Sequence, residues 1–259
     1  MSESLMSPIL VFDSGVGGLS VLAEIERLFP GRNYLFCIDN AGFPYGTKTE
    51  TDVTARVRQV LTELIPKYSP SLVVIACNTA STVALEEVRV EHSIPIVGVV
   101  PAIKPAAATS KTKIIGLLAT PGTVMRPYTD KLIREFAPDC RVVKVGSEPL
   151  VEMAEARLRG TEPALAAIKK ETAPLAAVKD LDTVVLGCTH FPLLKDLLQK
   201  ALPQVSQWLD SGAAIAKRVA EISSTNESGE GRKIALFTRN DESSKMLLPY
   251  LQKNRFSIA

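Results

Sequence analysis

Two short stretches of the chain, LVVIACNTAS from Leu72 and TVVLGCTHFP from Thr183, end in the same way. In each, an apolar run stops at a small residue and a cysteine, Cys77 or Cys188, and polar residues that can begin a helix follow. A cysteine at such a point lies beside unpaired backbone N–H groups and the positive end of the helix dipole, which favour the thiolate. The same N–H groups, with the hydroxyl of Thr79, form a receptor for a carboxylate. The pattern predicts two reactive cysteines that can each carry a proton.

Two such thiols on opposite faces of one small substrate could invert a carbon centre. One of them, as a thiolate, removes a proton, and the other, as a thiol, supplies a proton to the opposite face. Asp13 ends the first apolar run, and His190 follows Cys188 by two residues. An aspartate at a strand end is often a helix cap, and a lone histidine is often structural. Because both occur beside these loops, we expect each to orient or tune one thiol.

The elements that must position these loops alternate along the whole chain. Short apolar runs typical of buried strands are separated by stretches with helical spacing, such as 18–29, 50–65, 79–90, 123–136, 163–178, 192–201 and 213–222. This alternation predicts an α/β protein with doubly wound parallel sheets, whose functional loops follow the carboxyl ends of the strands. The repeated cysteine loop predicts two similar domains, 1–98 with 210–259 and 99–209, and a polar flexible loop at 223–232.

Composition excludes several broad classes. The 259 residues include 30 Lys and Arg against 28 Asp and Glu, scattered without a basic block, so nucleic acid is a poor candidate partner. No apolar run approaches the roughly 18 to 20 residues that span a bilayer, and no secretory leader is visible, which predicts a cytoplasmic protein without a membrane partner. In such a compartment the four cysteines are expected to be free thiols, with Cys37 and Cys140 serving only in packing.

Four motifs in order carry a family resemblance. VFDSGVGGLSVL, PYGTKT, VVIACNTAST and VLGCTHFPLL together resemble the glutamate racemases, cofactor-independent enzymes that supply D-glutamate for peptidoglycan, and the resemblance extends from about Ile9 to Val219. It implies two domains with pseudo-twofold symmetry and an active site in the cleft between them. Oligomeric state is left open, with a homodimer as one form.

The resemblance also implies roles for individual residues. Cys77 and Cys188 correspond to the paired acid/base residues, and Asp13, Glu152 and His190 to the residues that assist them. Glu155 is a second glutamate within one turn of Glu152. The positions implied to contact the glutamate substrate are Asp13, Ser14, Tyr45, Gly46, Asn78, Thr79, Thr120, Thr123, Thr189 and His190.

Other readings of the same residues remain open. An aspartate racemase or a racemase of another acidic amino acid also pairs cysteines, and a non-catalytic amino-acid-binding module would explain the carboxylate-receiving loops. The GVGGLS turn and Asp39 partly match a dinucleotide-binding fingerprint, although serine replaces the third glycine. Cys77, Cys188 and His190 could bind zinc, although their spacing is unusual. Pyridoxal phosphate would require a lysine, and Lys48 is the only one in these loops, so we expect no cofactor and no metal.

Overall fold

The computed structural model describes residues 7–223 and 231–259 and divides into two compact units. The first unit comprises Met1–Val99 and Gly212–Ala259, and the second comprises Val100–Ser211. From the sequence, the chain was expected to leave the first domain after Gly98 and to return to it at Asp210. Most of the predicted polar loop, residues 224–230, lies outside the described residues.

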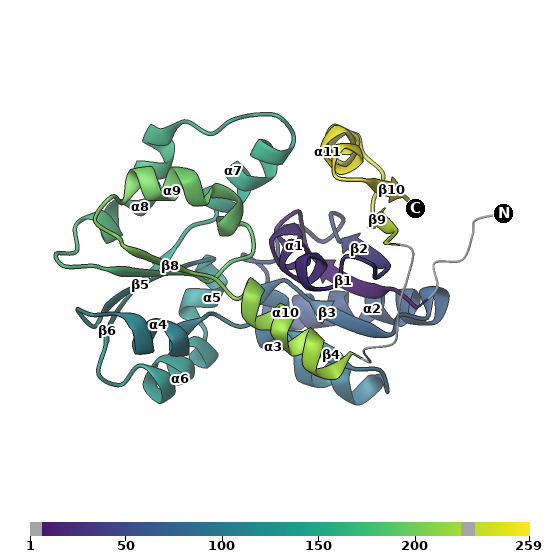
Figure 1. Ribbon diagram of the computed structural model, residues 1–259, viewed down its shortest axis with the longest axis horizontal. Coiled ribbons are helices and arrows are strands. Elements are labelled where there is room, and N and C mark those ends of the chain that lie inside the picture. Colours follow the sequence, from purple (N-terminus) through teal and green to yellow (C-terminus); the bar gives the residue numbers. More distant parts are fainter. Residues whose placement is uncertain (1–6, 224–230) are drawn as a thin grey trace. The chain divides into compact units, whose positions relative to one another are not determined.

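The first unit is built on a six-stranded sheet in the order β10-β9-β2-β1-β3-β4, in which every pair is parallel (Figure 1). Its strands are β1 (Ile9–Asp13), β2 (Tyr34–Ile38), β3 (Leu72–Ile75), β4 (Ile96–Gly98), β9 (Lys233–Phe237) and β10 (Phe256–Ile258). Its helices are α1 (Gly18–Leu28), α2 (Glu50–Tyr68), α3 (Asn78–Glu91), α10 (Gly212–Ile222) and α11 (Glu242–Lys253).

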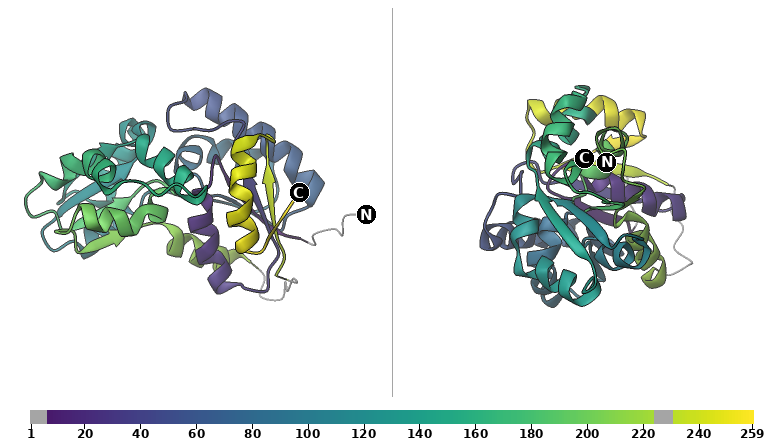
Figure 2. Two further views of the ribbon diagram at one scale, coloured as in Figure 1. Left: turned by 90° about the horizontal axis from the view of Figure 1, so that it is seen from above. Right: turned by 90° about the vertical axis from the view of Figure 1, so that its left-hand side faces the viewer.

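Helices cover both faces of this sheet. Leu10 and Phe12 of β1 and Leu35 of β2 pack with the apolar stripes of α2 and α3 on one face. Phe36 points to the other face, where Gly18 at the start of α1 lies so close that an added Cβ would be 2.8 Å from the Phe36 ring. On that face α1 packs against α10, and α11 lies against β10 (Figure 2). All five residues of β1 and of β2 are therefore buried, because successive side chains point to opposite faces and helices cover both faces.

The second unit has a four-stranded parallel sheet in the order β6-β5-β7-β8. Its strands are β5 (Ile114–Ala119), β6 (Arg141–Gly146), β7 (Thr183–Leu186) and β8 (Gln207–Leu209). Its helices are α4 (Ile103–Thr109), α5 (Pro121–Met125), α6 (Pro127–Phe136), α7 (Pro149–Leu158), α8 (Leu165–Ala176) and α9 (Lys195–Ala201), with a 3-10 helix η1 (Phe191–Leu194). Ile115, Leu117 and Ala119 pack with α4, α5 and α6, whereas Gly116 faces Leu175 of α8 on the opposite side.

The two sheets repeat the same plan. The order β2-β1-β3-β4 in the first unit corresponds to β6-β5-β7-β8 in the second. The register agrees as well, because Phe12 lies opposite Ile75 and Leu118 lies opposite Leu186. The residue after each of these third strands closes the sheet with one more hydrogen bond, from Ala76 N–H to the Phe12 carbonyl and from Gly187 N–H to the Leu118 carbonyl, both 2.8 Å long. Cys77 and Cys188 therefore leave equivalent strands at equivalent positions.

These observations confirm the predicted α/β class with parallel sheets, and they correct several element boundaries. The helix expected at 123–136 is two helices that meet at Arg126, because Pro127 follows and disfavours helical backbone at the preceding residue. The helix expected at 192–201 begins as the 3-10 helix η1, and the short strand β10 was not predicted.

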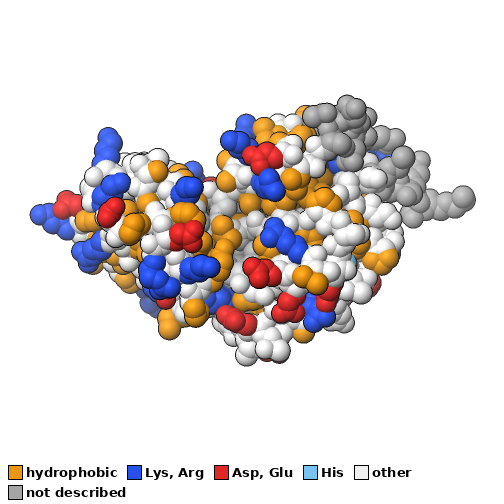
Figure 3. All heavy atoms as spheres, turned by 90° about the horizontal axis from the view of Figure 1, so that it is seen from below, with side chains coloured by type: hydrophobic (Ala, Val, Ile, Leu, Met, Phe, Trp, Pro, Cys, Tyr) orange, Lys and Arg blue, Asp and Glu red, His pale blue; other side chains and the backbone are white. Residues whose placement is uncertain are grey.

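Positive and negative side chains are mixed on the surface, as expected from the nearly balanced numbers of basic and acidic residues. Lys and Arg side chains lie among acidic and apolar ones on the face shown in Figure 3, and the formal net charge is +2. In the part of the chain that is described, no helix is both long enough and apolar enough to cross a membrane.

Candidate active site

The carboxyl ends of the strands in the first sheet bring together polar residues from separate loops. Since all strands run parallel, Asp13 at the end of β1, Asp39 after β2 and Cys77 after β3 emerge at one edge. Asp13 and Asp39 are fully buried and Cys77 is 6% exposed. Burial of this much polar chemistry at one edge marks the region as a site rather than a set of solvated loop ends.

Asp13 and Ser14 organise the loop in front of Cys77. The Asp13 Oδ1 atom accepts a hydrogen bond of 3.0 Å from the backbone N–H of Gly15, which fixes the turn that leads into α1. The Ser14 hydroxyl lies 3.4 Å from the same carboxylate oxygen and 3.8 Å from the Cys77 sulfur. Ser14 thus connects the carboxylate of the first strand to the thiol of the third.

Cys77 is the N-cap of α3, and the helix begins with Asn78 and Thr79. Its side chain makes no capping hydrogen bond, so the thiol is not used to satisfy the first turn. Asn78 and Thr79 are both buried, and within 7–223 and 231–259 the Asn78 Oδ1 atom has no hydrogen-bond partner. A buried amide oxygen without a donor is costly. Asn78 is therefore suited to accept a hydrogen bond from a ligand.

Tyr45 is tied to the strand edge through Asp39. The Tyr45 hydroxyl donates a 2.6 Å hydrogen bond to Asp39 Oδ2, and Thr238, after β9, donates one of 2.6 Å to Asp39 Oδ1. The Arg56 guanidinium of α2 contacts both carboxylate oxygens. Burial alone would raise the pKa of Asp39, but the hydrogen bonds from Arg56, Thr238 and Tyr45 lower it below its ordinary value. Gly46, next to Tyr45, is buried in the same loop.

The hydrogen bonds to Asp39 argue against a dinucleotide-binding site. Both Asp39 oxygens already accept hydrogen bonds from protein donors, so this carboxylate is not poised for a ribose hydroxyl. The close approach of α1 to the sheet at Gly18 explains the glycine there by packing. Arg56 was not predicted to belong to the site. It directly precedes Val57, a buried residue of α2, and this position is the feature by which the sequence could have indicated it.

In the second sheet, Cys188 and His190 occupy the end of β7. Cys188 is a free thiol, 6% exposed, and its sulfur lies 3.7 Å from His190 Nδ1. The opposite ring nitrogen, His190 Nε2, lies 2.7 Å from Glu155 Oε1, and Glu155 also pairs with Arg159 one turn later on α7. Burial alone would lower the pKa of His190, but its contacts with Cys188 and Glu155 raise it well above the ordinary value. The ring lies between a sulfur and a carboxylate, and these two contacts favour its charged form.

The glutamate beside His190 is Glu155, and the role implied for Glu152 remains a prediction. Glu152, which the family resemblance was taken to imply, is exposed, whereas Glu155 is 8% exposed and contacts His190. Three residues along α7 separate the two, and the packing of α7 against η1 turns the Glu155 position inward. Glu155 is thus the carboxylate that the structure brings to His190.

Polar residues flank Cys188 at the same edge. Thr189 is buried next to it, and Thr120 and Thr123 follow β5, the strand beside β7. Thr120 caps α5, since its hydroxyl oxygen accepts from the Thr123 N–H at 3.3 Å, and the two hydroxyls are 3.0 Å apart. Contact of these threonines with a substrate remains a prediction.

Glu148 was missed by the sequence analysis. It is the N-cap residue of α7, yet its side chain makes no capping hydrogen bond, and neither buried carboxylate oxygen has a partner among the described residues. Burial raises the pKa of this carboxyl, and nearby His190 opposes that effect. A glutamate directly before Pro149 looks like an ordinary helix start in the sequence, so nothing there indicated burial.

Cys37 and Cys140 lie outside these strand-end loops. Cys37 is fully buried in the core beside α2, where burial raises the pKa of its thiol, and Cys140 is half-buried. Across residues 7–223 and 231–259, no group of three or more His, Cys, Asp or Glu side chains is arranged to hold a metal ion.

The comparisons with known proteins agree with one another. The family described as Asp/Glu/Hydantoin racemase matches residues 9–219. A glutamate racemase of Histophilus somni (strain 129Pt) is 53% identical over 219 residues, covering 85% of this chain and 82% of that protein. The glutamate racemase of Salmonella typhimurium is 48% identical over 252 residues, covering 96% and 89%.

Solved structures give the same picture. The Escherichia coli glutamate racemase, crystallised with L-glutamate and the activator UDP-MurNAc-Ala, superposes with a TM-score of 0.92 at 46% identity, covering 97% of this chain and 96% of that one. The glutamate racemase isoform RacE1 of Bacillus anthracis gives a TM-score of 0.84 at 28% identity, covering 98% and 97%.

Proposed function

The chain belongs to the Asp/Glu/hydantoin racemase family, and we propose that it interconverts L-glutamate and D-glutamate without a cofactor, with Cys77 and Cys188 as the two acid/base residues. The observation that carries this proposal is the equivalence of the two sheets. Each sheet presents a cysteine two residues beyond its third strand, and each cysteine has a polar partner within 4 Å, Ser14 in one unit and His190 in the other.

The proposed reaction exchanges one proton for another on the α-carbon. One cysteine begins as a thiolate and takes the α-proton, while the other begins as a thiol and delivers its proton to the opposite face. No oxidant or leaving group is involved, and the two sulfurs exchange protonation states in each turnover. The enzyme can then act directly on the other enantiomer. Alternatively, the two sulfurs first exchange protons with solvent and return to their starting protonation states. Thiols suit both directions because a sulfur pKa can be tuned close to the working pH.

The partners of the two sulfurs differ, and so do their proposed tasks. His190 contacts the Cys188 sulfur through Nδ1, and Glu155 orients the ring and favours its charged form. On the other side, the Ser14 hydroxyl connects Cys77 with the Asp13 carboxylate. His190, Glu155, Asp13 and Ser14 therefore serve as tuning and positioning groups for the two thiols.

The same loops provide for the charges of glutamate. The first turn of α3, at Asn78 and Thr79, offers backbone N–H groups to a carboxylate, and Asn78 Oδ1 can accept a hydrogen bond from the α-ammonium group. Thr189 and the Thr120 and Thr123 pair offer hydroxyl donors in the second unit. Tyr45 and Gly46 shape the loop in front of Cys77. Fixed donors aimed at the α-carboxylate would stabilise the developing carbanion in place of a cofactor.

The relatives support the proposed substrate, whereas the proposed biological role comes from the family resemblance. Those described above are named glutamate racemases, and E. coli glutamate racemase was crystallised with L-glutamate, which favours glutamate over aspartate. D-glutamate supply for peptidoglycan is the proposed role.

The test of this function is direct. Purified protein is incubated with L-glutamate and no added cofactor, and optical rotation is followed to zero. Parallel incubations with L-aspartate and L-alanine test which substrate side chain the reaction requires. Decay with glutamate, slower decay with aspartate and none with alanine supports the proposal. Equal rates for glutamate and alanine, or no decay with glutamate, would overturn it.

A further inference from the structure

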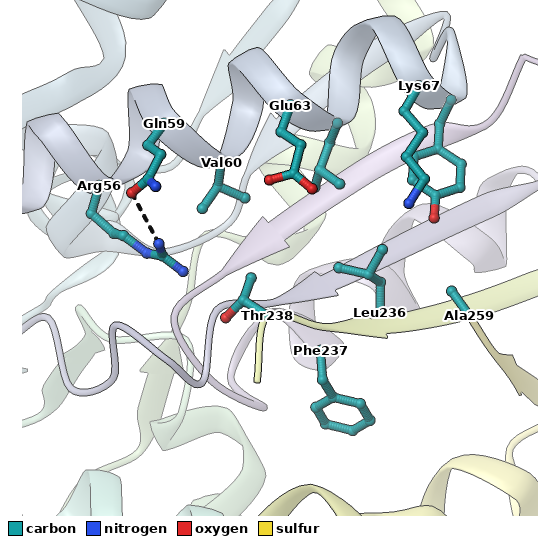
Figure 4. A pocket seen from close by; sticks show the side chains of 11 residues that line it. Arg56, Gln59, Val60, Glu63, Lys67, Leu236, Phe237, Thr238 and Ala259 are labelled. Atoms are coloured by element: carbon teal, nitrogen blue, oxygen red, sulfur yellow. Dashed lines mark hydrogen bonds between the residues drawn. The ribbon is translucent and has the colours of Figure 1, made fainter. Parts of the chain in front are cut away.

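A cavity of about 330 Å³ lies within the first unit, between α2 and the end of β9, and Cys77 is not among its lining residues (Figure 4). Its walls include Arg56, Val60, Glu63 and Leu64 of α2 and Leu236 and Thr238 of the β9 segment. Figure 4 shows Arg56 and Glu63 projecting from α2 toward β9, while Leu236 points back toward the helix.

The topology explains why this space is open. α2 covers β1 and β2, but β9 and β10 extend the sheet beyond it. The connection from β9 through α11 to β10 runs in the direction opposite to that from β2 through α2 to β3. Because such crossovers are right-handed, α11 lies on the other face. No α11 residue belongs to the core that α2 and α3 share. The outer strands are thus left with an unoccupied strip beside α2.

One edge of the Arg56 guanidinium binds Asp39, and N–H groups that do not bind Asp39 remain on its other edge. Its Nε and Nη2 atoms donate to Asp39, and Nη1 donates a 3.0 Å hydrogen bond to the exposed amide of Gln59. A guanidinium has five N–H groups, so an N–H of Nη1 and an N–H of Nη2 remain on the outer edge, in the fork geometry that suits a carboxylate. An incoming carboxylate would compete with Gln59 and leave the bond to Asp39 in place.

Glu63 provides the opposite charge two turns away. It follows Arg56 by seven residues, which is about 10.5 Å along the helix axis. Among the described residues Glu63 has no ion pair, although Lys67 lies one turn further on and instead sits over the Tyr68 ring at 5.1 Å. Between the two charged ends, Val60, Leu64 and Leu236 contribute apolar side chains to a lining that also includes Gln59 and Lys67.

We infer that this cavity binds a small zwitterion whose carboxylate and ammonium groups are separated by a short apolar chain, with the carboxylate on the outer edge of Arg56 and the ammonium on Glu63. An ω-amino acid or a short apolar peptide has this chemistry. A free α-amino acid does not, because a single carbon separates its charges. The site is distinct from the one proposed for glutamate.

The cavity also reaches the loop that carries Tyr45. Arg56 holds Asp39, and Asp39 accepts the hydrogen bond from Tyr45. A carboxylate on the outer edge of Arg56 draws positive charge away from Asp39, which alters the environment of the Tyr45 hydroxyl. Occupancy of the cavity is therefore sensed at Tyr45 without contact between the ligand and the glutamate-binding loops.

The test is a titration of ¹⁵N-labelled protein, followed by NMR, with four probes: 6-aminohexanoate, the dipeptide Ala-Ala, hexanoate and hexylamine. We expect saturable shifts at Arg56 Nε and at the Tyr45 amide with 6-aminohexanoate, with a Kd on the order of 1 mM. Ala-Ala distinguishes a peptide ligand from an ω-amino acid. Hexanoate and hexylamine, which each carry one charge, should bind about two- to five-fold more weakly.

Two variants in the cavity and one control variant sharpen the result. Gln59→Glu places a carboxylate at Nη1 and should abolish saturable binding, whereas Gln252→Glu, the same change on exposed α11, should leave it unchanged. Glu63→Gln should remove the advantage of 6-aminohexanoate over hexanoate. The inference is overturned if no probe gives saturable shifts at Arg56, if hexanoate binds as well as 6-aminohexanoate, or if Gln59→Glu binds normally. These readouts do not depend on racemase activity, so they stand apart from a failure of the proposed function.

Discussion

His190 bridges Glu155 and Cys188, with Nε2 2.7 Å from the Glu155 carboxylate and Nδ1 3.7 Å from the Cys188 sulfur. Because the ring is buried, a charged imidazole would be costly there without both neighbours. The pair of contacts therefore links the charge of a helix residue to a sulfur on a strand end. In the proposed function this link positions His190 against the Cys188 sulfur.

Replacing Glu155 by Gln should lower the pKa of His190, since the carboxylate that favours the imidazolium is removed. We expect kcat to fall about ten- to one-hundred-fold, with the loss concentrated on the alkaline side of the pH profile. The raised pKa of His190 stabilises the folded state below the unfolded pKa of about 6.5, and this stability is lost as pH rises through the folded pKa. The variant should therefore lose more stability at pH 5 to 6 than at high pH.

The matched control is Glu152→Gln, which makes the same change three residues earlier on the exposed face of α7. An NMR titration of His190 in both variants decides the point. A His190 pKa that moves equally in both, or only in Glu152→Gln, would show that the wrong carboxylate has been assigned.

The contrast between Glu152 and Glu155 shows where the sequence stops being informative. The strand ends at Asp13, Cys77 and Cys188 could be located because a buried parallel strand ends where its apolar run ends. Which of two glutamates on one helix faces inward depends on how α7 packs on η1, and that contact joins segments about forty residues apart. Local spacing does not encode it.

The surroundings of Asp39 and Glu148 were harder to predict from the sequence for the same reason. Asp39 was visible as a strand-end aspartate, but its partners Arg56, Tyr45 and Thr238 come from three other segments. β10 and the split at Arg126 were missed because a three-residue strand has almost no periodicity and because a helix pattern can continue across a break. Tertiary pairing decided each of these features.

Replacing Tyr45 by Phe removes one of the three side chains that donate to Asp39. We expect the free energy of unfolding to fall by about 1 to 2 kcal/mol, as for a hydrogen bond to a charged group. The lowered pKa of Asp39 gives stability above its unfolded pKa that disappears as pH falls through the folded pKa. With Tyr45 gone that pKa rises, so acid unfolding should begin at a higher pH.

Urea unfolding followed by circular dichroism over a range of pH checks this, with Tyr250→Phe as control. Tyr250 also loses a hydroxyl, but among the residues described here that hydroxyl has no hydrogen-bond partner. An equal effect of both substitutions would mean that the bond to Asp39 contributes nothing.

Replacing Glu148 by Gln should stabilise the folded protein at neutral pH. Its carboxylate oxygens are buried without a partner, and burial raises the pKa of the group, so folding is opposed when the group ionises. The gain should be on the order of 1 kcal/mol above the folded pKa and should vanish below the unfolded pKa of about 4.3. Thermal unfolding at pH 4 and at pH 8 measures this difference, and a gain at pH 4 alone would contradict it.

Replacing either Cys77 or Cys188 by Ser should lower kcat/KM for racemisation about 10²- to 10⁴-fold in both directions, since a hydroxyl is a much weaker acid than a thiol. Cys140→Ser, a half-buried cysteine outside the site, is the matched control and should retain normal activity. Initial rates from L-glutamate and from D-glutamate give the comparison. Near-normal turnover in either active-site variant would remove that cysteine from the mechanism.

Hydrogen isotope exchange in deuterated water examines most directly whether two separate sulfurs handle the α-proton. Wild-type protein is mixed with protiated L-glutamate, and the isotope at the α-carbon of both enantiomers is measured by mass spectrometry during the first few per cent of conversion. With two sulfurs, the new D-glutamate carries deuterium from the start and the remaining L-glutamate stays protiated. If L-glutamate gains deuterium as fast as D-glutamate forms, or D-glutamate retains the original protium, a single group moves the proton and the two-cysteine account is wrong.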